Sequence, residues 1–297
     1  AGAPQTDQAA KLRTPALLET LIAGAEPGAI MVSSATVPFL ERRFDLVSAG
    51  PVAGIAGQAY RLAGRDATGL GLWGRLGKFV GRRHELDLLK DRWSLAARGR
   101  GQVVGLVGEP GVGKSRLVWE FTHAETTQDY LAVEAAGVSM GATAPYLTAT
   151  ELLRDYFRVE AGDDARLIEG KVMAKLAALD EALVPLGPAL LTLLDVRVSD
   201  RQWEAMNGAE RRHRTLEAFK LLLVRETRVQ PLRIVVEDAH WIDGETQAML
   251  ETLAEGIPTA RILILITFRP EYGHGWSSRG FYTQLRVGPL SPGGAEE

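Results

Sequence analysis

The sequence predicts an α/β protein whose main sheet is parallel and is covered by helices on both faces. Two observations carry this prediction. Solid apolar runs, which are typical of strands buried on both faces, alternate with helix-like segments after residue 78. One of these runs, VVGLV (103–107), leads through the glycine-rich stretch GEPGVGKS (108–115) into a helix-like segment.

The elements follow one another in a simple order. In the first part we expect a helix at 15–25, a strand at 29–33, a helix at 35–44 and strands near 45–54 and 57–63. After it we expect a helix at 82–97, a strand at 103–107, a helix from 114, a strand at 130–134, a mostly helical stretch to about 228, a strand at 232–236, a helix at 244–255 and a strand at 262–267. In the long helical stretch, the basic run ERRHR (210–214) opens a helix whose Leu216, Phe219 and Leu223 form one apolar face.

A glycine-rich stretch divides the chain into two regions. Glycine is unfavourable within regular elements, so residues 66–77 are predicted to be a linker between residues 1–65 and residues 78–297. With 46% apolar and 24% charged residues, the composition is that of an ordinary globular protein.

Charge and residue usage exclude several classes of function. The net charge of −3 gives no bulk attraction to nucleic acid or to anionic membranes. The absence of cysteine excludes disulfides, thiolate metal sites and a cysteine nucleophile. No apolar run approaches the roughly 20 residues of a membrane span, and no signal peptide is visible at the N-terminus. A cytoplasmic protein with no membrane or direct nucleic-acid partner is therefore expected.

The stretch GEPGVGKS matches the phosphate-binding pattern G-x-x-x-x-G-K-[ST] in full. Its glycines allow backbone N–H groups to surround a phosphate, and the following helix start adds its own N–H groups. Lys114 would bridge the β- and γ-phosphates, while the Ser115 hydroxyl would bind Mg²⁺. The plainer alternative is a tight turn that matches the pattern by chance. The residues expected to bind nucleotide here are Gly108, Glu109, Pro110, Gly111, Val112, Gly113, Lys114, Ser115 and Arg116.

A pair of acids ends another apolar run. In PLRIVVEDAHWID (231–243) the predicted strand is followed by Glu237 and Asp238, which places both at the carboxyl edge of a parallel sheet, where ligands bind. One acid can hold Mg²⁺, here Glu237, and the next, Asp238, can orient the attacking water. The alternative is a strand that simply ends in two solvated acids.

Four segments together resemble the STAND branch of the AAA-related ATPases, which are regulatory switches that hold ATP or ADP. The segments are FVGRRHELDLL (79–89), GLVGEPGVGKSRLVWEF (105–121), VVEDAHWID (235–243) and ITFRPEY (266–272). The resemblance implies a P-loop NTPase fold with a five-stranded parallel sheet of order 5-1-4-3-2 and the P-loop strand beside the ITFR strand. It also implies Mg²⁺ with ATP or ADP as ligand, and a protein effector or self-association as the partner interaction.

The same resemblance assigns further site residues. Phe79, Val80 and Arg82 match the segment that lines the adenine pocket, and Arg269 matches the position that senses the γ-phosphate. Arg269 would thereby join Lys114 and Asp238 in catalysis, because a guanidinium presents a fixed fork of donors to phosphate. The alternative for Arg269 is a surface arginine after a strand.

The chain departs from the family pattern in two places. The acids run Glu237–Asp238, whereas the wider class has Asp followed by Glu, and the shorter second acid implies slow hydrolysis. In the family, the sequence PLS (289–291 in this chain) leads into a helical lid. We therefore expect this chain to be the core of a longer ATPase that stops at the boundary of the lid. His240 and Trp241 match the pair that follows the acids, although packing accounts for a tryptophan there equally well.

Residues 14–64 resemble the last third of a class III nucleotidyl cyclase domain, on the order AEPG, strand, SSAT, helix, RF and a final AYRL strand. In that family an Asn and an Arg contact the ribose and the phosphate, but the aligned residues here are Ala16 and Thr20. Neither can supply charge-assisted hydrogen bonds, so cyclase chemistry is not expected. We therefore expect a regulatory ATPase core joined to a cyclase remnant. Two alternatives stay open, a cyclase regulated by the ATPase core and a nucleotide-holding scaffold that never hydrolyses ATP.

Overall fold

The computed structural model divides the chain into two compact units, residues 1–78 and 79–297. It describes residues 79–124, 130–138, 144–160 and 162–290 of the larger unit and, in the smaller one, residues 19, 21–22, 25–26, 29–34, 36–40, 44–51 and 58–65. The expected linker at 66–77 lies outside these residues, as do Ala16, Thr20 and most of the expected first helix.

The smaller unit contains a three-stranded antiparallel sheet of order β1-β3-β2. Its strands are β1 (Ile30–Ser33), β2 (Phe44–Pro51) and β3 (Gln58–Arg65), with the short helix α2 (Val37–Leu40) between β1 and β2. All three strands expected from the sequence are confirmed. The described part of the expected second helix is one turn, α2.

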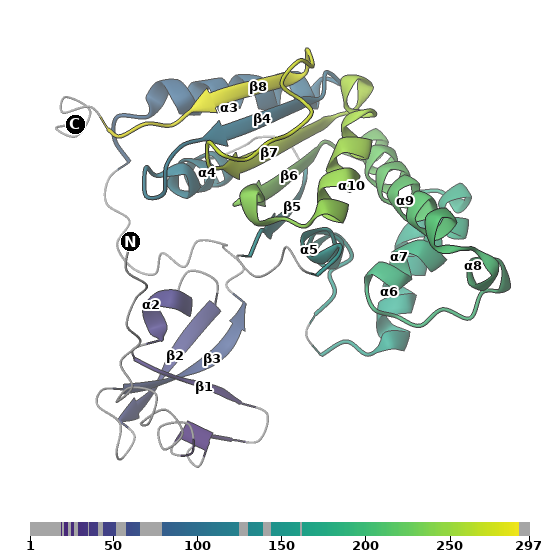
Figure 1. Ribbon diagram of the computed structural model, residues 1–297, viewed down its shortest axis with the longest axis horizontal. Helices are drawn as coiled ribbons and strands as arrows, with labels where there is room; N and C mark the ends of the chain where they lie inside the picture. Colours follow the sequence, from purple (N-terminus) through teal and green to yellow (C-terminus); the bar gives the residue numbers. More distant parts are fainter. Residues whose placement is uncertain are drawn as a thin grey trace. The chain divides into compact units, whose positions relative to one another are not determined.

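The larger unit is built on a five-stranded parallel sheet (Figure 1). Its strands are β4 (Gln102–Val107), β5 (Leu131–Ala136), β6 (Leu232–Glu237), β7 (Ile262–Phe268) and β8 (Tyr282–Arg286), in the order β5-β6-β7-β4-β8. Numbered one to five along the chain and counted from the β8 edge, these strands stand in the order 5-1-4-3-2, with β4 beside β7. The parallel α/β fold predicted from the sequence is confirmed.

Strand β7 shows why these segments are solid apolar runs. Every residue of the strand is buried. Ile262, Ile264 and Ile266 belong to the core on one face of the sheet, whereas Leu263 and Leu265 belong to the core on the other. Since side chains alternate between faces, a strand covered on both sides is apolar at nearly every position.

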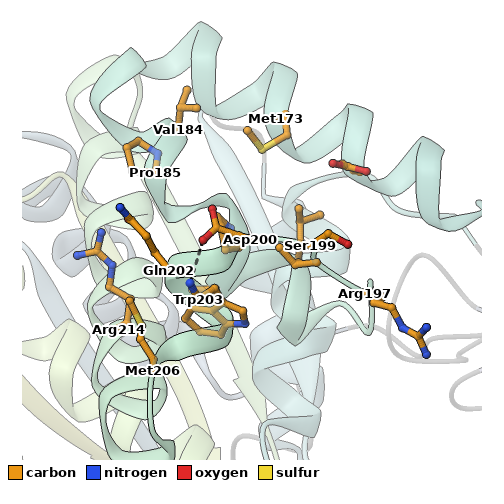
Figure 2. Close-up of a pocket in the computed structure, with 15 residues that line it drawn as sticks. Met173, Val184, Pro185, Arg197, Ser199, Asp200, Gln202, Trp203, Met206 and Arg214 are labelled. Atoms are coloured by element: carbon orange, nitrogen blue, oxygen red, sulfur yellow. Dashed lines mark hydrogen bonds between the residues drawn. The ribbon is translucent and has the colours of Figure 1, made fainter.

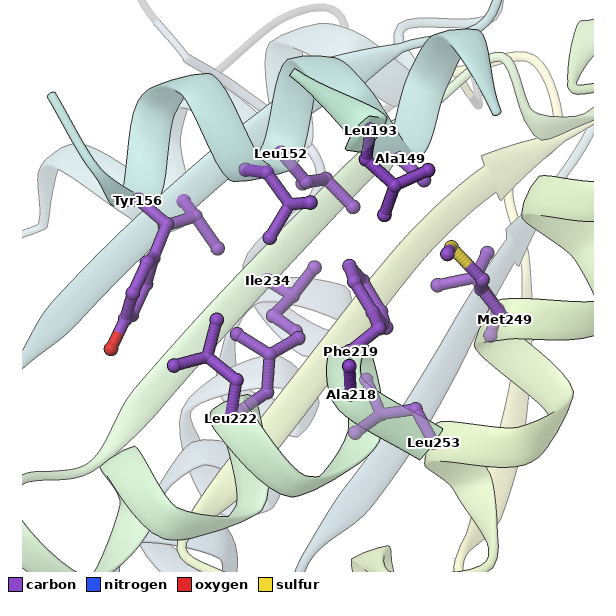
Figure 3. Packing of buried hydrophobic residues seen from close by; sticks show 14 of the residues in the cluster. Ala149, Leu152, Tyr156, Leu193, Ala218, Phe219, Leu222, Ile234, Met249 and Leu253 are labelled. Atoms are coloured by element: carbon purple, nitrogen blue, oxygen red, sulfur yellow. The ribbon is translucent and has the colours of Figure 1, made fainter. Parts of the chain in front are cut away.

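Helices supply the two cores. α3 (Arg83–Ala97) and α4 (Lys114–His123) pack on one face of the sheet through residues such as Trp93 and Phe121. On the other face lie α5 (Leu147–Tyr156), α9 (Gly208–Val229) and α10 (Gly244–Ala254). Phe219 of α9 and Ile234 of β6 are part of the core on this face (Figure 3). The remaining elements are α6 (Ala165–Leu179), η2 (Glu181–Leu186), α7 (Gly187–Leu193), α8 (Arg201–Ala205), η3 (Ala239–Trp241) and η4 (Ile257–Thr259). None of the helices described is both long and apolar enough to cross a membrane.

The helix α9 begins with a reciprocal cap. The Asn207 side chain accepts a hydrogen bond from the Glu210 N–H (3.0 Å), and the Glu210 carboxylate accepts one from the Asn207 N–H (2.9 Å). This capping box satisfies two N–H groups that have no partner inside the helix. The apolar face expected from the sequence is confirmed, because Leu216, Phe219 and Leu223 are all buried.

A buried carboxylate on α9 joins this helix to α5 and α6. Glu226 has no solvent-exposed surface. Its Oε2 accepts hydrogen bonds from the Tyr156 hydroxyl (2.5 Å) and the Lys175 ammonium (3.0 Å), and its Oε1 accepts one from the Gln230 amide (2.7 Å). Burial acts to raise the pKa of Glu226, but these hydrogen bonds outweigh burial and hold the pKa below its usual range.

Glu226→Ala is expected to lower the free energy of unfolding by about 2–3 kcal/mol, because it leaves the buried Tyr156 hydroxyl without an acceptor. Urea unfolding at pH 7 measures this. The folded-state pKa of Glu226 lies below that of the unfolded chain. Its contribution is therefore complete above the unfolded-state pKa and is lost as the pH falls through the folded-state value. Equal stability of the two proteins at pH 7 would contradict the assignment.

Candidate nucleotide-binding site

The glycine-rich loop connects the end of β4 to the start of α4 (Figure 1). Gly111 and Gly113 have φ angles of 81° and 94°, a left-handed conformation that side chains disfavour. Gly113 is the N-cap of α4 and provides no side-chain cap, so the positive end of the helix dipole faces the loop. Glu109, Pro110 and Gly111 are exposed. The backbone therefore has the shape of an anion cradle.

The loop begins in close contact with the segment that leaves β8. A Cβ atom on Gly108 would lie 2.3 Å from the carbonyl oxygen of Val287. The Val287 N–H donates a hydrogen bond to the carbonyl oxygen of Val107 (2.8 Å). No residue larger than glycine fits at position 108 without separating the loop from this segment.

Lys114, the first residue of α4, folds back over the loop. Its Nζ donates hydrogen bonds to the carbonyl oxygens of Gly108 (2.7 Å) and Glu109 (3.0 Å). Burial is the main cause that lowers the pKa of Lys114, and the nearby Arg269 acts in the same direction. Asp238 is the strongest of the groups that oppose this shift, so its charge is close to that of Lys114.

Ser115 and Glu237, which are 122 positions apart in the sequence, form a direct hydrogen bond. The Ser115 hydroxyl donates to Oε2 of Glu237 at 2.5 Å. Ser115 lies in the first turn of α4, and Glu237 is the last residue of β6. The structure thus brings together the two residues that the sequence proposed as metal ligands. Within the described part of the chain, no group of three or more histidine and acidic side chains could itself hold a metal.

Asp238 lies in a strained turn immediately after β6. Its φ of 50° and ψ of 46° are left-handed, a conformation that aspartate tolerates better than most residues. Its N–H donates to the Thr267 hydroxyl at the end of β7 (2.9 Å), and its carbonyl oxygen accepts from the Trp241 N–H (2.9 Å). These bonds fix the turn between two neighbouring strands. Glu237 and Asp238 therefore have different surroundings, although they are adjacent in the sequence.

Arg269 follows β7 directly and lies near the same group of residues. Its guanidinium carbon is 5.6 Å from the centre of the Trp241 ring, which is a cation–π contact. Arg269 also lowers the pKa of His240, although less than burial does. Asp238 and Arg269 thus follow the adjacent strands β6 and β7, and both charges act on the pKa of Lys114.

The segment before α3 contacts the loop through Arg82. Its guanidinium donates hydrogen bonds to the carbonyl oxygens of Val112 (3.3 Å) and Gly288, and to the Glu85 carboxylate (2.9 Å). Arg82 therefore joins the loop, α3 and the segment after β8. This side chain, which the resemblance placed at the adenine pocket, is held by protein groups.

Phe79 and Arg116 link the same segment to α4. The Arg116 guanidinium lies 5.8 Å from the centre of the Phe79 ring and 5.5 Å from that of Trp119, and it forms an ion pair with Glu120. Val80 is half-buried next to Phe79. The three residues expected to line the adenine pocket therefore belong to a segment that lies against the phosphate loop.

Two features of the site had no clear signal in the sequence. The contact between Trp241 and Arg269 joins η3 to the end of β7, and neither residue belongs to a periodic pattern. Both ring nitrogens of His240 are buried, and they have no hydrogen-bond partner among the residues described. Burial is the main cause that lowers the pKa of His240, and it favours the neutral form of this imidazole.

A cavity of about 550 Å³ lies elsewhere, among α6, α7, α8 and the start of α9. Figure 2 shows Trp203, Met206 and Met173 along its walls. None of the residues predicted for the nucleotide site lines it. The nucleotide site is therefore defined by the loop and the strand ends, and not by this cavity.

A parallel sheet whose glycine-rich loop leads into a helix, with a carboxylate reaching the start of that helix, defines the class of P-loop NTPases. The family described as AAA ATPase domain matches residues 78–266, and the chain belongs to this family.

The chain is 27% identical over 226 residues to an uncharacterized protein of Rhizobium meliloti (strain 1021), a match that covers 73% of this chain and 21% of that protein. The chain thus spans about a fifth of the length of this relative.

Two solved structures resemble the fold distantly. One is a Signal Transduction ATPase with Numerous Domains (STAND) protein with a tetratricopeptide repeat sensor from Pyrococcus horikoshii, at 16% identity and a TM-score of 0.34, covering 75% of this chain and 25% of that chain. The other is a chain of Drosophila ORC bound to DNA, at 15% identity and a TM-score of 0.33, covering 70% of this chain and 93% of that chain. At these TM-scores the likeness supports no functional argument.

Proposed function

We propose that the larger unit binds ATP and hydrolyses it slowly to ADP and phosphate, and that it acts as a nucleotide-controlled signalling switch. The observation that carries the proposal is the hydrogen bond between Ser115 and Glu237, combined with the Lys114 side chain folded over the same loop. Together they supply a cation for the phosphates and two hard oxygen ligands at one helix start. Membership of the AAA ATPase domain family supports this reading.

Ser115 and Glu237 fit Mg²⁺, because this ion prefers oxygen ligands and takes only one or two carboxylates beside substrate phosphates and water. When bound, Mg²⁺ would neutralise charge on the β- and γ-phosphates. Lys114 would leave the carbonyl groups of Gly108 and Glu109 to contact the phosphates. The amide groups at the start of α4 would add further donors.

Asp238 is proposed to accept a proton from the attacking water, and Arg269 to stabilise charge on the transferred phosphoryl group. Both lie near Lys114, whose pKa they shift in opposite directions. The carboxylate of Asp238 is one methylene shorter than glutamate, which supports slow turnover. Slow turnover suits a switch whose nucleotide state is read by a protein effector or by another copy of the chain.

The smaller unit is proposed to be a remnant of a nucleotidyl cyclase domain without activity of its own. Its described antiparallel sheet is compatible with an α+β segment. A functioning cyclase would need metal-bound carboxylates and a cation at the α-phosphate. The resemblance places Ala16 and Thr20 at two active-site positions, and neither residue carries a charge.

Product analysis of the 297-residue chain on ATP with Mg²⁺ tests these proposals. We expect ADP and phosphate, and no cyclic AMP above a Lys114→Ala control; with GTP, and with Mn²⁺ in place of Mg²⁺, we expect no cyclic nucleotide. Cyclic nucleotide from the wild-type chain would instead favour the cyclase alternative. Tightly retained ATP without any product would favour a non-hydrolysing scaffold.

A further inference from the structure

We propose that Trp241 is a positioning residue whose indole face holds the Arg269 guanidinium at the γ-phosphate end of the nucleotide site. The inference rests on the proposed function, in which Arg269 contacts the third phosphate of ATP. It adds a residue that acts through Arg269 and so determines how the site distinguishes ATP from ADP.

The contact leaves the hydrogen-bonding groups of Arg269 available. The guanidinium carbon lies 5.6 Å from the centre of the Trp241 ring. Within the described part of the chain, this guanidinium forms no hydrogen bond and no ion pair. A carboxylate partner would occupy the N–H groups, whereas an aromatic face attracts the cation and leaves its five donors to an anion.

Trp241 is itself fixed by the turn that carries Asp238. The backbone N–H of Trp241 donates a hydrogen bond to the backbone carbonyl oxygen of Asp238 (2.9 Å). Gly137, which follows β5, lies against both residues, since a Cβ there would be 2.4 Å from the Asp238 oxygen and 3.1 Å from the Trp241 Cβ. Trp241 therefore links the turn after β6, through its backbone, to the arginine after β7, through its indole face.

The charges near Lys114 include both signs. Arg269 lowers the pKa of Lys114, whereas Asp238 raises it more strongly. The contact with the indole face therefore adds a support for Arg269 that depends on none of these charges of the loop, since it comes from the ring of Trp241 at 5.6 Å. We infer that this contact keeps the guanidinium near the place where the third phosphate would lie.

Trp241→Leu in the full chain tests the inference. The probes are ADP and AMP-PNP, a non-hydrolysable ATP analogue, titrated with Mg²⁺ in a calorimeter. We expect the affinity for AMP-PNP to fall about three- to tenfold and the affinity for ADP to stay unchanged, because only the third phosphate uses Arg269. Trp241→Phe keeps an aromatic face and is expected to lose about two- to threefold. If Trp241→Leu does not fold, as judged by thermal unfolding, the affinities for AMP-PNP and ADP are compared between Trp241→Phe and the wild type.

The Arg269→Ala background separates positioning from packing. In that background Trp241→Leu should change the affinity for neither nucleotide, because Arg269, the residue that Trp241 supports, is absent. An equal loss for ADP and AMP-PNP, a loss that persists in Arg269→Ala, or tighter binding of AMP-PNP by Trp241→Leu would each overturn the inference. A wild-type chain that binds neither nucleotide would instead contradict the proposed function, and the inference with it.

Discussion

Replacing Lys114 with alanine is expected to weaken the binding of Mg·ATP by about 30- to 150-fold, equivalent to about 2–3 kcal/mol, while the fold is retained. Lys114 is buried at the start of α4 and contacts the carbonyl oxygens of Gly108 and Glu109. Its charge is therefore held within the loop, where it can reach phosphate, and among the residues described it forms no ion pair with a carboxylate.

Titration of a fluorescent ATP analogue into wild type and Lys114→Ala measures this effect. Lys90→Ala is a matched control, since Lys90 is an exposed lysine on α3. Thermal unfolding of all three proteins should give similar midpoints, because the loop carbonyl groups released by Lys114→Ala can bind water. Equal affinity of wild type and Lys114→Ala for the analogue would mean that the loop is a turn and not a phosphate cradle.

Much of the fold could be predicted because parallel strands leave a strong mark in the sequence. All residues of β7 are buried, and so are all residues of β4. Such runs cannot be confused with half-exposed strands. The order of the strands depends on which segments pair across the chain, and it came only from the family resemblance. The breaks between α5 and α9 were not predicted, because their residues form a nearly continuous helical signal.

The contact between Ser115 and Glu237 could be anticipated from topology, although 122 positions separate the two residues. The carboxyl ends of parallel strands meet at one edge of the sheet, so the loop after β4 and the acid after β6 are expected at the same edge. The contacts of Trp241 and Arg82 could not be anticipated in this way. They depend on side-chain conformations outside regular elements, where no periodicity shows which way a residue points.

Asp238→Asn is expected to reduce ATP hydrolysis by at least about 100-fold, because an amide cannot accept a proton from the attacking water. Binding of ATP should persist. Asparagine tolerates the left-handed backbone of this position, with its φ of 50°, at least as well as aspartate does. The backbone bonds to Thr267 and Trp241 do not involve the side chain and should remain. The loss would therefore reflect chemistry and not a rearranged turn.

Glu237→Gln is the matched comparison, because it also replaces a carboxylate with the amide of the same length, in the neighbouring acid. Its hydrogen bond from Ser115 can survive on the amide oxygen, but the negative charge beside the helix start is lost. We expect ATP affinity in Mg²⁺ to fall toward the value measured in EDTA, whereas Asp238→Asn should keep the full difference between the two conditions. Single-turnover formation of ADP and titrations with and without Mg²⁺ give both quantities for each variant. If Asp238→Asn hydrolyses ATP at the wild-type rate while Glu237→Gln binds it normally but does not hydrolyse it, then Glu237 acts on the water and the proposed roles of the two acids must be exchanged.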